Sequence, residues 1–196
     1  MCLIRMDHSM SKVAAVDEPA FRMSREAYRA WAEQREAGRF ERVNGVVVAT
    51  APERANHNLR KFRVAQALDA AVRAAGLPCQ VFTDGMTVEV GDSDYEPDAV
   101  LRCGGTLPGD AIALPDPLVI VEVLSPATSG IDRAWKLQEY FRLPSLRHYL
   151  IVWADKPQIV HHRRGDDGEI ETRTVEGGEM GLDPPGIMIT VEDVYA

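Results

Sequence analysis

Hydrophobic positions along the chain follow two different periods, and the alternation of these periods predicts strands and helices. Residues 118–124 are apolar at every position except Glu122, and a short continuous run of this kind predicts a strand buried on both faces. The run HYLIVW at 148–153 has the same character. We expect the other strands to be at 40–49, 80–83, 87–90, 99–103, 158–163 and 169–174.

Turn residues indicate how some of these strands connect. Asn44-Gly45 lies between two apolar runs and predicts a hairpin with a type I′ turn. Asp84-Gly85 predicts a turn at or near the junction of strands 80–83 and 87–90, and GDDG at 165–168 predicts an edge hairpin that joins the last two strands.

Helical periods fill three of the remaining segments. We expect helices from Ser24 to about Ala37, from about Asn56 to Ala75, and from Ile131 to Leu143. The expected apolar stripe of the second helix is Leu59, Phe62, Leu68 and Val72, and its expected charged outer face is Arg60, Lys61, Arg63 and Arg73. The segment 187–195 is of uncertain type. This order of elements predicts an α/β domain with a mixed sheet whose central strand is followed by a crossover helix.

Composition limits the protein class. The chain has 196 residues, which predicts one domain at 23–196 after a flexible N-terminal extension at 1–22. No apolar run is long enough for a membrane span, and no signal peptide is recognisable, so we expect a cytoplasmic protein. Cys2, Cys79 and Cys103 show no CxxC pairing, which favours free thiols over a disulfide. The net charge of −8 argues against a protein that coats nucleic acid nonspecifically.

Three acidic residues lie within or at the start of predicted strands. Glu122 interrupts the most buried strand, where an isolated carboxylate is costly unless a cation or a reaction needs it. Asp98 follows a proline at the start of another strand, Glu41 lies in the first arm of the hairpin, and Lys136 lies on the helix after Glu122. If these side chains converge, their oxygens suit Mg²⁺ or Mn²⁺. The alternative is that Glu122 reaches water or pairs with an arginine near the strand end.

Six pieces of sequence then occur in an order that resembles a known family. The Pro97-Asp98 pair followed by Glu122 is similar to the PD-(D/E)xK nuclease superfamily, which has the restriction-endonuclease-like fold. More narrowly, residues 24–153 resemble the Uma2 family of restriction-endonuclease-like proteins. The pieces are FERVNGVVV, AP followed by His57-Asn58, EPDAVL, VIVEVLSPAT, Asp132 to Lys136 with Tyr140, and HYLIVW.

The resemblance implies a restriction-endonuclease-like fold, with a mixed central sheet flanked by helices and an N-terminal helix and hairpin. It implies that Asp98 and Glu122 bind the metal, that Glu41 is a third ligand, and that Mg²⁺ or Mn²⁺ is the cofactor. The superfamily usually has a lysine where this chain has Leu124, and the family carries one on the next helix, here Lys136. The implied substrate is DNA, and the implied assembly is a homodimer.

Several alternatives stay open at the level of sequence. Lys136 is either catalytic or a partner of Asp132 one helical turn away. His57 either contacts a phosphate or serves as a helix-cap or core histidine. The chain is either a Mg²⁺-dependent endonuclease or a catalytically silent module of the same fold that binds DNA or protein. The net charge and the absence of lysine at 124 favour the silent module, whereas the set Glu41, Asp98, Glu122 and Lys136 favours the enzyme.

Overall fold

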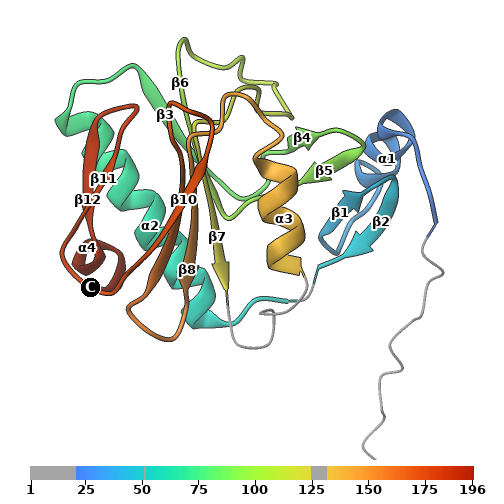
Figure 1. The fold of residues 1–196 in the computed structure, drawn as a ribbon. Coiled ribbons are helices and arrows are strands. Elements are labelled where there is room, and N and C mark those ends of the chain that lie inside the picture. The colour runs from blue at the N-terminus through green and yellow to red at the C-terminus, as the bar shows by residue number, and fades with distance from the viewer. Residues whose placement is uncertain (1–20, 51, 125–131) are drawn as a thin grey trace, which may run out of the picture.

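A computed structural model describes residues 21–50, 52–124 and 132–196, with only the backbone of residues 132–134. A six-stranded sheet forms its centre, in the order β10-β9-β8-β7-β6-β3 (Figure 1). These strands are β3 (Cys79–Thr83), β6 (Ala99–Cys103), β7 (Val119–Leu124), β8 (His148–Trp153), β9 (Ile159–Arg164) and β10 (Ile170–Val175). Only β7 and β8 are parallel, and α3 (Asp132–Tyr140) connects them as the predicted crossover helix.

Helices cover both faces of this sheet because alternate residues of β7 and β8 point to opposite sides. Val121, Val123 and Leu150 pack against the long helix α2 (Ala55–Ala74) and the C-terminal helix α4 (Val191–Tyr195). Ile120 and Ile151 face the other way, toward α3 and β4 (Val88–Val90). Figure 1 shows α2 and α3 on opposite sides of β7. The predicted two-faced burial of the central strand is therefore confirmed.

A second sheet lies beside the first, in the order β2-β1-β5-β4. It contains the predicted hairpin, β1 (Phe40–Val43) and β2 (Val46–Ala49), together with β5 (Ser93–Tyr95), which the sequence pattern did not reveal. Asn44 and Gly45 both have positive φ, at 49° and 77°, as a type I′ turn requires. The helix α1 (Arg25–Ala32) begins after the N-cap Ser24 and packs on this sheet, ending five residues before the predicted Ala37.

The C-terminal segment completes the side of the molecule that carries α2. Strands β11 (Glu179–Leu182) and β12 (Ile187–Thr190) form an antiparallel pair, and a capping box between Thr190 and Asp193 starts α4. None of the helices within the described ranges combines the length and apolar character that a bilayer crossing needs. Of the expected N-terminal extension, only Phe21 and Arg22 are among the described residues, and Arg22 forms an isolated bridge with Val46.

Two sequence predictions were wrong, the free thiols and the buried face of α2. The predicted turn at Asp84-Gly85 is present, but the strands beside it do not pair with each other, because β3 pairs with β6 in the central sheet and β4 pairs with β5 in the second sheet. The pairing of β3 with β6 places Cys79 directly opposite Cys103, and these two cysteines form a disulfide rather than free thiols. On α2, Leu59 and Phe62 are about half exposed.

The second error concerns the orientation of α2. Its buried face consists of Lys61, Val64, Ala65, Ala67, Leu68 and Val72. Lys61, predicted to lie on the solvated face, has a side chain that is only 3% exposed. The helix is therefore rotated from the predicted orientation, and this rotation brings a lysine into the interior.

Candidate active site

The site lies where β6 and β7 meet at the boundary between the two sheets. The antiparallel register pairs Ala99 with Val121, so Asp98 immediately precedes the paired part of β6 and Glu122 immediately follows the paired part of β7. Asp98 precedes β6. Its side-chain Oδ2, in place of a backbone carbonyl, accepts a hydrogen bond of 2.6 Å from the Val123 N–H of β7. The two carboxylates predicted as metal ligands therefore lie side by side.

Glu41 reaches this site from the second sheet. It lies on β1, and its Oε1 accepts a hydrogen bond of 3.1 Å from the backbone N–H of Glu96, two residues before Asp98. Burial leaves the Glu41 side chain 12% exposed. The segment that connects β5 to β6 thus links Glu41 to Asp98, although the two residues are 57 positions apart in the sequence.

Lys136 joins two of the predicted ligands. Its Nζ lies 3.2 Å from Oε1 of Glu41 and 3.1 Å from Oε1 of Glu122, and it also lies 5.4 Å from the centre of the Tyr95 ring. The Tyr140 hydroxyl, one turn further along α3, donates a 2.7 Å hydrogen bond to the same Glu122 oxygen. The helix that follows β7 therefore turns both Lys136 and Tyr140 back over the buried carboxylate. The alternative pairing of Lys136 with Asp132 involves a side chain outside the described residues.

Burial and like charges raise the pKa of Glu122 to about 7. Desolvation is the largest cause, and the negative charges of Asp98 and Glu41 act in the same direction, while the Lys136 ammonium and the Tyr140 hydrogen bond oppose them. The site thus concentrates negative charge in a region where water cannot screen it.

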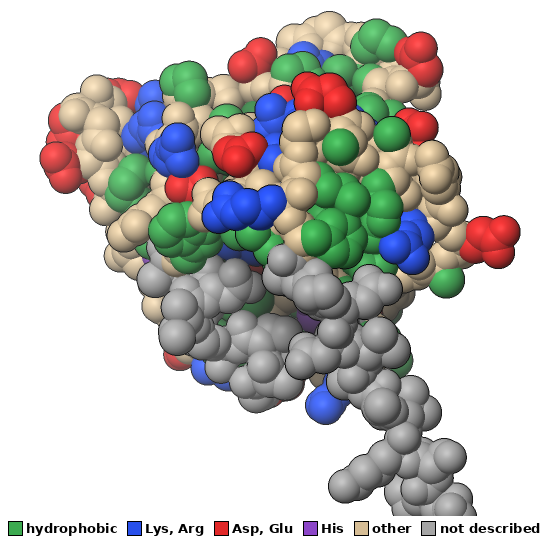
Figure 2. Space-filling model, turned by 90° about the vertical axis from the view of Figure 1, so that its right-hand side faces the viewer, with side chains coloured by type: hydrophobic (Ala, Val, Ile, Leu, Met, Phe, Trp, Pro, Cys, Tyr) green, Lys and Arg blue, Asp and Glu red, His purple; other side chains and the backbone are tan. Residues whose placement is uncertain are grey.

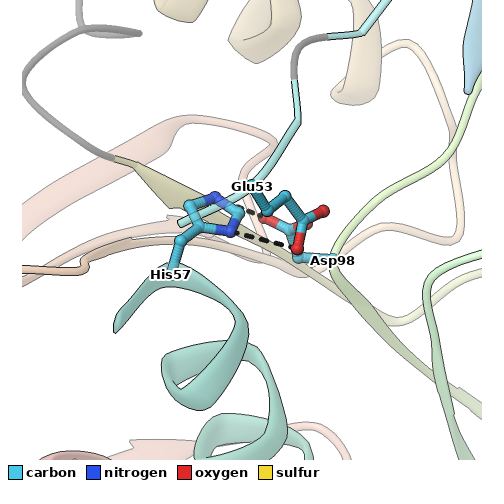
Figure 3. A group of neighbouring side chains, drawn as sticks. All are labelled: Glu53, His57 and Asp98. Carbon is cyan, nitrogen blue, oxygen red and sulfur yellow. Dashed lines mark ion pairs between the residues drawn. The ribbon is translucent and has the colours of Figure 1, made fainter. Parts of the chain in front are cut away.

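A second group of ligand atoms shares Asp98. Glu53, His57 and Asp98 each offer one atom within 4.8 Å of the others, and this is the group among the described residues whose geometry suits a metal ion (Figure 3). Glu53 precedes α2, and His57 lies in its first turn, with Nδ1 3.6 Å from Glu53 and Nε2 3.8 Å from Asp98. Sequence reasoning missed Glu53, although it lies one helical turn before His57.

His57 also contacts the backbone of β7. Its Nε2 lies 2.7 Å from the Val123 carbonyl oxygen, so Nε2 carries the proton that is donated. Val123 is thus bound on both sides, because its N–H donates to Asp98 and its carbonyl accepts from His57. This contact fixes the strand next to Glu122. The predicted phosphate contact of His57 stays a prediction.

Lys61 is a further residue of the site that sequence reasoning assigned to the solvent. Its Nζ lies 2.6 Å from Glu53, 2.8 Å from Asp84 and 3.1 Å from Asp98. Burial alone would lower the pKa of Lys61, but its hydrogen bonds with Asp84 and Glu53 and the charge of Asp98 raise it. The signal was available in the sequence, because Lys61 precedes Val64, Ala65, Leu68 and Val72 at helical spacing.

Comparison with known proteins places the chain in a family. A family model described as "Uma2: Putative restriction endonuclease" matches residues 25–192, which is most of the chain.

The chain belongs to the Uma2 family.

Two similar proteins from Synechocystis sp. are described as uncharacterized. The protein slr1290 is 26% identical over 189 residues, covering 90% of this chain and 93% of the relative. The protein sll1609 is 24% identical over 139 residues, covering 69% and 77% of the two chains. A crystal structure of a putative nuclease belonging to DUF820 from Anabaena variabilis is similar, with a TM-score of 0.71 and 13% identity over 88% of this chain and 97% of that one. This structural match confirms the predicted fold, a mixed sheet with flanking helices.

The elevated pKa of Glu122 in this Uma2 chain predicts a pH-dependent stability. The folded chain holds the Glu122 proton up to about pH 7, whereas a carboxyl of ordinary pKa 4.5 releases it earlier. The stabilisation is therefore fully present below pH 4.5 and is lost as the pH rises through 7. At about 1.4 kcal/mol per pKa unit, the contribution is on the order of 3 kcal/mol.

The measurement is urea unfolding in EDTA between pH 5 and pH 8. The wild-type free energy of unfolding should fall over this range, and Glu122→Gln should reduce the slope, since an amide does not titrate. The exposed Glu171 provides the control, and Glu171→Gln should keep the wild-type slope. Parallel slopes for the wild type and Glu122→Gln would show that another group titrates.

Proposed function

We propose that the chain is a metal-dependent endonuclease that hydrolyses DNA phosphodiester bonds. The observation that carries this proposal is that Glu41 and Glu122 both contact Lys136, while Asp98 lies close enough to Glu122 to raise its pKa. Membership in a family whose model is described as "Putative restriction endonuclease" supports it. Carboxylates that gather next to a lysine are a recurrent arrangement for phosphoryl chemistry, because they can bind a divalent ion beside a proton-transfer group.

The donor atoms of Glu41, Asp98 and Glu122 suit a hard divalent cation, although the described group whose ligand atoms already lie within 4.8 Å of one another is Glu53, His57 and Asp98. The donor atoms of the first set are carboxylate oxygens, which Mg²⁺ and Mn²⁺ prefer. Desolvation, and after it the negative charges of Asp98 and Glu41, raise the pKa of Glu122, and a divalent ion would favour the ionised carboxylate. We propose that Glu41, Asp98 and Glu122 hold Mg²⁺ or Mn²⁺. Such an ion would polarise the scissile phosphate and lower the pKa of a bound water.

The protein's own groups orient these carboxylates. Asp98 is held by the Val123 N–H, Glu122 by the Tyr140 hydroxyl, and Glu41 by the Glu96 N–H. Each contact uses one oxygen of a carboxylate, so the side chain has a defined direction before any ligand arrives. Lys136 would then either orient and deprotonate the attacking water or stabilise the charge that develops on the phosphate.

DNA must approach a chain whose net charge is −8. Figure 2 views the side of the molecule that carries α1, β1 and β2, where basic and acidic side chains lie beside one another. Arg25 and Arg29 both pair with Glu89 in this region. We infer that DNA binding depends on the bound metal ion more than on a basic surface. The homodimer that the resemblance implies stays a prediction.

A catalytically silent module that binds DNA or protein is the second candidate. Two observations favour it, the net charge of −8 and Leu124 at the position where the superfamily usually has a lysine. The silent module predicts that none of the site carboxylates affects cleavage, since no cleavage occurs.

Plasmid nicking in Mn²⁺ tests the proposal. The wild type should convert supercoiled plasmid to the open-circular form, and EDTA should stop the reaction. Glu122→Gln should lower the rate about 10²-fold or more, since it removes a ligand oxygen and a charge from the site. Glu171→Gln, a change at an exposed carboxylate, should cut like the wild type. Equal cleavage by Glu122→Gln would indicate a contaminating nuclease, and no cleavage by any variant would favour the silent module.

A further inference from the structure

The Lys61 ammonium lies at the centre of three carboxylates from separate parts of the chain. Glu53 comes from the segment before α2, Asp84 follows β3, and Asp98 precedes β6. One oxygen of each lies between 2.6 and 3.1 Å from the Lys61 nitrogen. Three anionic oxygens directed at one point form a cation position, and here the cation belongs to the protein itself.

The lysine is fixed in this position by the helix that carries it. Lys61 lies on the buried face of α2, in line with Val64 and Leu68, which have no exposed surface. Its own side chain is 3% exposed. Withdrawing the ammonium would leave the buried Asp98 facing two partly exposed carboxylates, Glu53 and Asp84, without a cation between them.

Lys136 is more exposed than Lys61. Its side chain is 12% exposed, and its contacts with Glu122 and Glu41 are 3.1 and 3.2 Å long. Lys136 is thus less enclosed than Lys61. This suits a group that must make room for a divalent ion and act on a substrate. The two lysines divide the acidic site into a part with a permanently fixed cation and a part that a divalent ion can enter.

We propose that Lys61 is a built-in cation, which fills the position among Glu53, Asp84 and Asp98 and keeps divalent ions out of it. Lys61 is then a positioning residue, because it holds Oδ1 of Asp98 while the Val123 N–H holds Oδ2. This arrangement directs metal binding to Glu41 and Glu122, on the other side of Asp98. The inference rests on the proposed function for the role of Asp98 as a metal ligand.

Arg39 is a second cation that contacts two of these carboxylates, from the solvent side. Its guanidinium lies 2.6 Å from Glu53 and 3.0 Å from Asp84, although it is 40% exposed. Together Lys61 and Arg39 supply two positive charges to three carboxylates. Loss of Lys61 would leave the three carboxylates with too little positive charge. A divalent ion could supply that charge, and His57 lies within reach as a further ligand.

The experiment counts Mn²⁺ ions bound per chain by equilibrium dialysis and calorimetry. Lys61→Ala opens the position and should bind one more ion than the wild type. Lys61→Met removes the charge but keeps much of the volume, so it should bind the wild-type number. Lys156→Ala removes an exposed lysine and controls for net charge. Adding Glu53→Gln to Lys61→Ala should abolish the extra ion.

A merely structural ion pair predicts a different result, in which Lys61→Ala loses stability but binds the wild-type number of ions. That result would overturn the inference. If Lys61→Ala is unfolded without metal, recovery of the folded state in Mn²⁺ but not in K⁺ supports the inference, and failure to recover contradicts it. If the wild type binds no ion while Lys61→Ala binds one, the inference on Lys61 holds and the proposed function fails.

Discussion

Replacing Lys136 with alanine should lower Mn²⁺-dependent DNA cleavage about 10²-fold or more, the usual scale for loss of an acid–base or charge-stabilising group. Metal affinity should stay nearly intact, because an ammonium is not a metal ligand. Lys136→Arg should recover little activity, since a guanidinium cannot deprotonate water and places its charge differently. Single-turnover cleavage and Mn²⁺ calorimetry on the same preparations separate these two effects.

A purely structural role for Lys136 predicts another pattern. If its function were to pair with Asp132, then Asp132→Ala and Lys136→Ala should behave alike, with small stability losses and normal turnover. The contacts of Lys136 with Glu41 and Glu122 argue for the catalytic role. A weaker Mn²⁺ affinity in Lys136→Ala, in proportion to its loss of cleavage, would instead mean that the lysine maintains the metal site.

Asp94→Ala should destabilise the fold by about 3–5 kcal/mol, the cost expected when a buried ion pair loses one partner. Asp94 and Arg42 are each 1% exposed, and Arg42 Nε lies 2.6 Å from Oδ2 of Asp94. Oδ1 of Asp94 accepts a 2.7 Å hydrogen bond from Arg25 on α1. The substitution leaves the Arg42 charge buried and loosens α1 from the second sheet.

Asp92→Ala is the matched control, because Asp92 also pairs with Arg42, at 2.7 Å, but is 68% exposed. We expect its loss to cost less than about 1 kcal/mol, as is usual for exposed ion pairs. Urea denaturation measures both variants, and equal losses would contradict the importance of burial. Because β1 carries both Arg42 and Glu41, Asp94→Ala should also weaken Mn²⁺ binding.

Local patterns predicted the parts of the fold whose signals lie within a few residues. The apolar run of β7, the Asn44-Gly45 turn and the hairpin of β9 and β10 were all found from the sequence, since each depends on its own residues. The pairing of β3 with β6 depends on residues far apart, so the sequence did not reveal it. The Cys79–Cys103 disulfide was missed for the same reason, because the sequence does not give the register.

In the candidate site, too, the sequence revealed the residues with a local signal and missed those that depend on the tertiary structure. Glu41, Asp98, Glu122 and Lys136 were predicted as site residues from motif order. The structure places Lys136 against Glu41 and Glu122, and Asp98 against the backbone N–H that follows Glu122. Lys61 was missed because charged residues on helices are usually assigned to the solvent, and the apolar pair Leu59 and Phe62 suggested another buried face. Only the tertiary arrangement reveals that Asp84 and Glu53 make burial of this lysine favourable.

The account depends most on a divalent ion bound at Asp98 and Glu122, and crystals soaked in Mn²⁺ test this claim directly through anomalous scattering. The account predicts a peak with carboxylate oxygens of Asp98 and Glu122 at roughly 2.0–2.6 Å, and with Glu41 beside it or one water away. The Lys61 ammonium should remain among Glu53, Asp84 and Asp98 in the same crystal. A peak at Glu53 and His57 with none at Glu122, or no peak at these carboxylates at all, would contradict the account.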